Sequence, residues 1–82
     1  MSKADKIRDF VLENYIQPAR ERGENEITIR AGDIHKVMGL RDSMPAVASA
    51  LGAEKFEKFA RVKLIKRKGP HNGANLRFTF QL

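Results

Sequence analysis

The feature that most constrains this fold is a regular alternation of apolar and polar residues at the carboxy-terminal end of the chain. Large apolar side chains occupy every second position there, at Leu76, Phe78, Phe80 and Leu82. A shorter alternation precedes it, with Val62 and Leu64 on either side of Lys63. Because strand side chains point alternately to opposite faces, both segments are predicted to be strands with one buried face. The turn-forming residues 69–75 between them predict a β-hairpin.

Charge is distributed unevenly along the 82 residues. Residues 1–59 contain ten Lys and Arg and ten Asp and Glu, which cancel, whereas residues 60–82 contain six cations and no acid. The formal net charge of +6 therefore resides in the predicted hairpin segment. A one-sided basic field attracts polyanions, whereas a surface that only confers solubility mixes its signs. The hairpin is accordingly the candidate surface for a polyanionic partner.

The composition is that of an ordinary globular domain, with 41% hydrophobic and 32% charged residues. A chain this short supports one hydrophobic core, so a single domain over residues 1–82 is expected. The absence of cysteine excludes disulfides, thiolate catalysis and cysteine-ligated zinc. The first residues lack an apolar signal segment, and no run approaches the roughly 20 apolar residues that span a membrane. We therefore expect a cytoplasmic protein.

The first segment is predicted to be a helix. Ser2 and Asp5 have the spacing of a capping box, and apolar residues follow at helical spacing. Pro18 is expected to end or kink this helix near Gln17, with a loosely helical, charged stretch running to Gly23. The resulting length makes this element one candidate surface for a homodimer.

A short strand and a second helix follow. Ile27 and Ile29 alternate with polar residues over a run too short for a helix, which predicts a brief strand. An apolar stripe then predicts a helix of about two turns. Its members are Ile34, Val37 and Met38. Gly39 is predicted to supply the left-handed cap that ends this helix.

A third helix is predicted directly after a tight turn, which makes the pair a helix-turn-helix. Asp42 or Ser43 would cap it, and Pro45 takes a first-turn position where a missing N–H costs little. Its buried positions follow the helical repeat. They are Met44, Val47, Ala48 and Leu51. Phe56 and Phe59, one turn apart, predict a further short helical segment that plugs the core.

The order helix, short strand, helix, tight turn, helix, strand, basic loop, strand resembles the winged helix-turn-helix superfamily over essentially the whole chain. The resemblance implies an α+β fold with a three-helix core and a small antiparallel sheet whose hairpin is the wing. In that superfamily the third helix commonly enters the major groove of DNA, and the wing lies along phosphates or in the minor groove. By resemblance, these roles fall on residues 43–51 and 66–77. Residues 29–47 also look like a stretch of short prokaryotic proteins to which no activity is attached.

The candidate wing contacts are side chains whose donors suit a phosphate backbone. They are Lys66, Arg67, Lys68, His71, Asn72 and Arg77. Lys63 belongs to the same basic segment, as a contact or simply as an outward-facing strand residue. The alternative hypothesis is a solvated basic edge, because lysine-rich edges deter strand-to-strand aggregation. We favour nucleic-acid contact because the acid-free segment covers both strands while the rest of the chain is neutral.

The third helix is weakly equipped to read bases. Its predicted exposed face consists of small residues, at Ser43, Ala46, Ser49 and Ala50. Only Arg41, in the preceding turn, has the reach for a guanine edge. Arg41, Ser43 and Ser49 are nevertheless its candidate DNA contacts. Small residues allow close approach to DNA, and they equally suit packing against a helix of another protein.

These patterns favour a non-catalytic DNA-binding protein with duplex DNA as its partner, either a transcriptional regulator or a module of a DNA-processing complex. The alternative is a protein-interaction adaptor of the same fold. RNA ranks third because no aromatic RNA-binding pair is present. His35 and His71 are too few and too far apart in sequence for a metal site, and no catalytic or phosphate-cradling motif occurs. We expect no cofactor, metal, membrane or small-molecule substrate, while a homodimer or a protein partner stays open.

Overall fold

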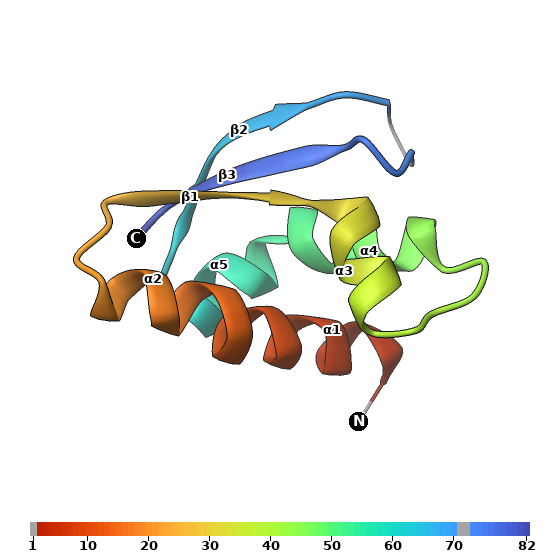
Figure 1. The fold of residues 1–82 in the computed structure, drawn as a ribbon, viewed down its shortest axis with the longest axis horizontal. Coiled ribbons are helices and arrows are strands. Elements are labelled where there is room, and N and C mark those ends of the chain that lie inside the picture. Colours follow the sequence, from red (N-terminus) through yellow and green to blue (C-terminus); the bar gives the residue numbers. More distant parts are fainter. Residues whose placement is uncertain (1, 71–72) are drawn as a thin grey trace.

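A computed structural model describes residues 2–70 and 73–82. It has two layers, a three-stranded antiparallel sheet and a set of helices that covers one face of that sheet (Figure 1). The helical elements of the described residues are α1 (Lys3–Val11), the π-helical turn η1 (Leu12–Ile16), α2 (Gln17–Glu21), α3 (Ala31–Val37), α4 (Met44–Gly52) and α5 (Glu54–Ala60). The strands are β1 (Glu26–Arg30), β2 (Lys63–Lys68) and β3 (Arg77–Gln81). The predicted α+β class is confirmed. Within the described ranges, no helix is long and apolar enough to cross a membrane.

The N-terminal helix begins as predicted but continues past its proline. In the capping box, the Ser2 hydroxyl accepts from the Asp5 N–H and the Asp5 carboxylate accepts from the Ser2 N–H. η1 joins α1 to α2 without a break, and the Gln17 N–H reaches back to the Leu12 carbonyl. Pro18 has no N–H, and its ring would clash with the preceding turn of an α-helix. The wider π turn at Leu12–Ile16 removes that conflict, so the helix does not end near Gln17, and the helical stretch expected beyond Pro18 is α2, which ends at Glu21.

The turn between α3 and α4 has the geometry predicted from its glycine. Gly39 has a φ of +67°. The N–H groups of Gly39 and Leu40 donate to the carbonyls of Lys36 and His35, at 3.1 and 3.0 Å. This pair of bonds is the Schellman motif, in which a left-handed residue closes a helix. Ser43 occupies the predicted N-cap position of α4, although its side chain makes no capping bond.

The strand order β1-β3-β2 places the last strand of the chain in the middle of the sheet. β1 and β3 pair without interruption, with Thr28 opposite Thr79. The β2–β3 pairing contains a β-bulge between Leu64 and Lys66, where Ile65 is the additional residue. Side chains alternate between the two faces, so one extra residue reverses the facing of every residue after it.

The bulge determines which hairpin cations face solvent. Lys66 pairs with Thr79 and Lys68 pairs with Arg77, on the face away from the helices. Arg67 pairs with the buried Phe78 and therefore faces the helical layer. Without the bulge, Lys66 and Lys68 would face the helices and Arg67 would face solvent.

The core lies between the inner face of the sheet and the helices. The hairpin residues predicted to be buried are so, with Phe78 and Phe80 at 0% exposure and Leu76 at 1%. The Phe56 ring meets Phe80 edge-on at a centroid distance of 5.2 Å, and Phe78 stacks on Phe80 at 6.1 Å. Val47 and Leu51 of α4 and Val62 complete the same cluster, and Leu64 and Leu82 pack against it. The predicted facing of the hairpin is confirmed.

Two apolar residues that the helical pattern placed in the core are exposed. Val37 is 61% exposed on α3, and Phe59 is 46% exposed on α5. Each helix has only seven residues and turns one face to the core, where Ile34 and Phe56 are fully buried. Val37 and Phe59 each follow one of these buried residues by three positions and lie beside the buried face. The prediction that they belong to the core was therefore wrong.

Candidate functional site

The outer face of the sheet carries most of the hairpin cations, and no helix of the described chain covers it (Figure 1). Its side chains form three rows across the strands in the order β1, β3, β2. The rows are Glu26, Gln81 and Lys63; Thr28, Thr79 and Lys66; and Arg30, Arg77 and Lys68. We call these nine residues the basic sheet face. Five of them are cations and only Glu26 is acidic.

The row Arg30, Arg77 and Lys68 places three cations side by side. Directly opposite residues have Cβ atoms about 4.5–5.5 Å apart, and like charges at that separation destabilise a sheet. Arg30 is partly neutralised, since it donates to the Asp33 carboxylate at 2.8 Å and to the Asn75 side-chain oxygen at 2.9 Å. Arg77 and Lys68 have no such partner among the described residues. A bound anion would relieve their repulsion.

The middle row contains a pair of hydroxyl groups beside a shallow hollow. The Oγ1 atoms of Thr28 and Thr79 are hydrogen-bonded to each other at 2.9 Å. The hollow measures about 140 Å³ and is lined by residues of all three strands. They are Thr28, Lys66, Lys68, Arg77 and Thr79. Every lining side chain can donate a hydrogen bond and none carries a negative charge, so the hollow favours an anion.

Arg67 has a packing role that its place in a run of three cations did not indicate. Its guanidinium carbon lies 5.1 Å from the centroid of the Phe78 ring. A Cβ atom added at Gly52, the last residue of α4, would come within 2.7 Å of the Arg67 Nη1. A guanidinium placed there is attracted by the ring face and by the negative end of the helix dipole. Arg67 therefore joins the sheet to α4 on the side away from the basic sheet face.

The turn between α3 and α4, together with the open face of α4, offers few groups to a partner. Ser43, predicted as a DNA contact, is only 3% exposed. Its hydroxyl donates to the Arg41 carbonyl at 2.6 Å and accepts from the Lys3 Nζ at 2.9 Å. The Ser43 N–H donates to the His35 Nε2 at 3.2 Å. These bonds hold Ser43 inside the turn and remove it from the contact surface, whereas Arg41 and Ser49 are exposed.

The small-residue face of α4 was expected to be exposed, and this expectation was correct only at Ser49. Ala50 is fully buried, and its carbonyl accepts from the Arg8 Nε of α1 at 3.1 Å. Ala46 is half-buried, so only Ser49 of this face is open to solvent. Small side chains let α1 approach α4 closely. A sequence pattern cannot distinguish such an internal contact from an open binding face.

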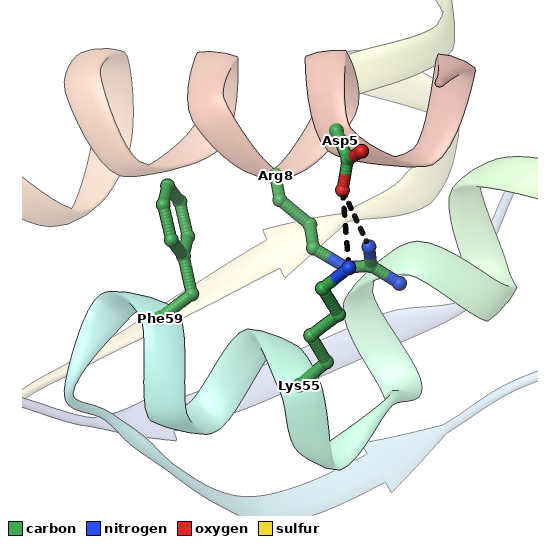
Figure 2. A pocket seen from close by; sticks show the side chains of 4 residues that line it. All are labelled: Asp5, Arg8, Lys55 and Phe59. Carbon is green, nitrogen blue, oxygen red and sulfur yellow. Dashed lines mark hydrogen bonds and ion pairs between the residues drawn. The ribbon is translucent and has the colours of Figure 1, made fainter. Parts of the chain in front are cut away.

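A second hollow, of about 90 Å³, lies between α1 and α5 and has one carboxylate beside two cations (Figure 2). One Asp5 oxygen accepts from the Arg8 Nη1 at 3.3 Å and from the Lys55 Nζ at 3.4 Å, and Phe59 lies at the other end. Hydrogen bonds from the Ser2 hydroxyl and the Ser2 backbone hold the pKa of Asp5 below its ordinary value, with a smaller effect of Lys55. The carboxylate thus stays ionised and offsets one of the two cations, which weakens the attraction of this hollow for an anion.

The structure brings together four hairpin residues that were predicted from the sequence as phosphate contacts. Lys63, Lys66, Lys68 and Arg77 share the basic sheet face. His71 and Asn72 lie outside the described residues. Sequence reasoning did not propose the other five members of the face, which are Glu26, Thr28, Arg30, Thr79 and Gln81. Their alternation with buried neighbours indicates that they point outward, but the β1–β3 pairing that brings β1 beside the hairpin carries no sequence signal.

Within residues 2–70 and 73–82, no group of three or more His, Asp or Glu side chains could hold a metal ion. Comparison of the chain with protein-family models, with curated proteins and with solved structures gave no match in any of the three. An assignment of function therefore depends on the surface chemistry alone.

Proposed function

We propose that this protein binds duplex DNA without catalysing a reaction, and that the basic sheet face is its main contact surface. The observation that carries the proposal is the row of cations Arg30, Arg77 and Lys68. Folded domains have a stability of only ~5–15 kcal/mol, so side-by-side like charges on an open face are a cost that calls for a function. A phosphate backbone relieves the repulsion and accepts charge-assisted hydrogen bonds from the same side chains.

The order of elements supports a winged helix-turn-helix arrangement. α1, β1, α3, the Gly39 turn, α4, β2 and β3 follow the order on which the resemblance was based, with α5 as an additional element. The β2–β3 hairpin takes the position of the wing. Three of its outward cations, Lys66, Lys68 and Arg77, come from the segment to which the resemblance assigned phosphate contacts.

Affinity is expected to come from phosphates and to depend little on base sequence. Of the residues of α4, only Pro45 and Ser49 are exposed, and neither makes the bidentate contacts that distinguish base pairs. Arg41, in the turn before α4, is the one nearby side chain with that reach. Phosphate contacts position a protein on DNA but carry no sequence information. The protein is therefore a weakly specific DNA binder, or a module that obtains specificity from a larger complex.

The alternatives have less support. The adaptor hypothesis required an open small-residue face on α4, and α1 covers most of that face. Recognition of single-stranded RNA relies on aromatic side chains that stack on bases, and the nine residues of the basic sheet face include none.

Fluorescence anisotropy with labelled duplexes, measured over a series of salt concentrations, tests the proposal. Each neutralised phosphate contributes about 0.9 to the slope of log affinity against log salt. Replacing Lys66 and Lys68 by alanine should weaken binding to all duplexes alike and flatten that slope by up to about 2.

The matched control is the double alanine variant of Lys6 and Lys58, two exposed lysines on the helices that cover the opposite side of the sheet. It removes the same charge and should bind DNA nearly as the wild type does. Equal weakening by both double variants would indicate an effect of net charge alone, and a wild type that binds no duplex would refute the proposal.

A further inference from the structure

We propose that the hollow in the basic sheet face is a seat for a single phosphate group of the DNA backbone, and that this seat fixes the register of the duplex on the sheet. The inference rests on the proposed function and assigns a distinct role to the two threonines. The hollow combines directional hydroxyl donors with cations from two strands.

The donors of the hollow exceed its acceptors. Thr28 and Thr79 share one hydrogen bond, in which one hydroxyl donates and the other accepts. The accepting hydroxyl keeps its own proton, and no acceptor among the described residues takes it. Lys66, Lys68 and Arg77 add N–H donors that also lack acceptors in the described chain. A ligand that satisfies them must present several acceptor oxygens, as a phosphate does.

The size of the hollow selects a small group. Sites for nucleosides and drug-sized molecules measure ~300–1,000 Å³. At about 140 Å³, open to solvent and without aromatic lining, the hollow holds neither a base nor a whole nucleotide. A phosphate group fits this volume, and the DNA strand to which it belongs can continue across the open sheet face.

The hydroxyl pair can hold a bound phosphate at one position, which the flexible lysines cannot do. Lysine is a flexible point charge that can follow a phosphate over a range of positions, whereas a threonine side chain on a central strand has a fixed position. Thr79 lies in the middle strand, between Thr28 on one side and Lys66 on the other. A hydrogen bond from this pair therefore holds one phosphate at one place, while the lysines contact its neighbours.

The test separates the hydroxyl groups from the charges. In the variant Thr28→Val/Thr79→Val, valine keeps the shape and the strand preference of threonine and removes both hydroxyls. Both positions are changed because either threonine alone keeps a donor. DNA affinity should fall roughly 3- to 10-fold, as for the loss of one hydrogen bond, and the salt slope should stay unchanged because no cation is lost. Gln17→Ala, which removes an exposed uncharged polar side chain from α2 in the helical layer, is the control and should bind as the wild type does.

Inorganic phosphate is the second probe, followed through the backbone amide NMR signals at constant ionic strength. Saturable shifts at residues 28, 66–68 and 77–79 are expected in the wild type, with a dissociation constant on the order of millimolar. They should be much weaker in the double valine variant. Duplexes with and without a 5′-phosphate should bind equally, because the seat takes an internal phosphodiester. Tighter binding of phosphorylated ends would overturn that assignment.

The outcomes distinguish this proposal from the one on which it rests. If the wild type binds duplex DNA and the double valine variant binds equally well, the phosphate seat is wrong while DNA binding stands. If phosphate shifts the signals of the hollow but no duplex binds, the hollow is an anion site, and both the proposed function and the assignment of the seat to a DNA phosphate fail.

Discussion

The repulsion between Arg77 and its neighbours predicts that Arg77→Thr makes the protein more stable while weakening its affinity for DNA. Arg77 lies on the central strand between Arg30 and Lys68, and it has no acceptor among the described residues. Threonine is a good strand former, so the substitution removes the charge without disturbing the sheet. Most exposed substitutions do not stabilise a protein, which makes the expected direction informative.

The size of the gain follows from Coulomb's law. Two unit charges about 5 Å apart in water interact by roughly 0.8 kcal/mol. Screening at 0.1 M salt, where the Debye length is ~10 Å, leaves about 0.5 kcal/mol, and screening at 1 M salt leaves less than about 0.2 kcal/mol. The pair with Lys68 dominates because Asp33 already offsets the charge of Arg30. Exposed side chains that move apart lower these values.

Thermal unfolding by calorimetry at the two salt concentrations measures the effect. A gain of 0.5 kcal/mol corresponds to a rise in Tm of about 2–4 °C for a domain of this size, and the rise should largely vanish at 1 M salt. Lys63→Thr is the control, because its cross-strand neighbour Gln81 is uncharged. A lower Tm for Arg77→Thr, or a rise that does not depend on salt, would refute the argument that this row is repulsive.

Three further predictions concern the scaffold, and thermal unfolding reports on each. Phe78→Ala should cost ~3–5 kcal/mol, because it empties a fully buried site stacked on Phe80, and an unchanged Tm would contradict the assigned core. Arg67→Ala should cost ~0.5–1 kcal/mol through its lost contact with Phe78, whereas Lys66→Ala should change stability by less than ~0.5 kcal/mol. The pKa of Asp5 is lowered by folding, so its stabilising effect is present above the ordinary value of 3.8 and is lost as the pH falls through the lowered pKa. Asp5→Asn should therefore lose less stability than the wild type as the pH falls below the ordinary pKa of 3.8, and an identical acid profile would count against the capping box.

The sequence was most informative where a short local pattern determines the structure. The capping box at Ser2, the left-handed Gly39 and the alternation from Leu76 to Leu82 each depend on neighbours within a few residues. The structure has all three. Local chemistry suffices at such positions because the competing conformations differ over only one turn or one strand.

The candidate site was less predictable because it depends on a bulge and on strand pairing. The additional residue Ile65 reverses the facing of Lys66 and Arg67, and an alternating pattern gives no indication of it. The pairing of β1 with β3, which brings Thr28 and Arg30 to the face, joins segments far apart in the chain. The burial of the small residues of α4 likewise depends on where α1 packs. Tertiary packing decides each of these features.

The most direct test of the central claim is an NMR titration of the labelled protein with a short duplex, in which the shifted amide signals map the contact surface. We predict that the largest shifts fall on the basic sheet face, at Lys66, Lys68, Arg77 and Thr79, and that Ser49 on α4 shifts little. The same pattern should appear with duplexes of unrelated sequence, because phosphate contacts carry no sequence information. Shifts concentrated on α4 and the turn at Arg41, with the sheet signals unmoved, would contradict the account.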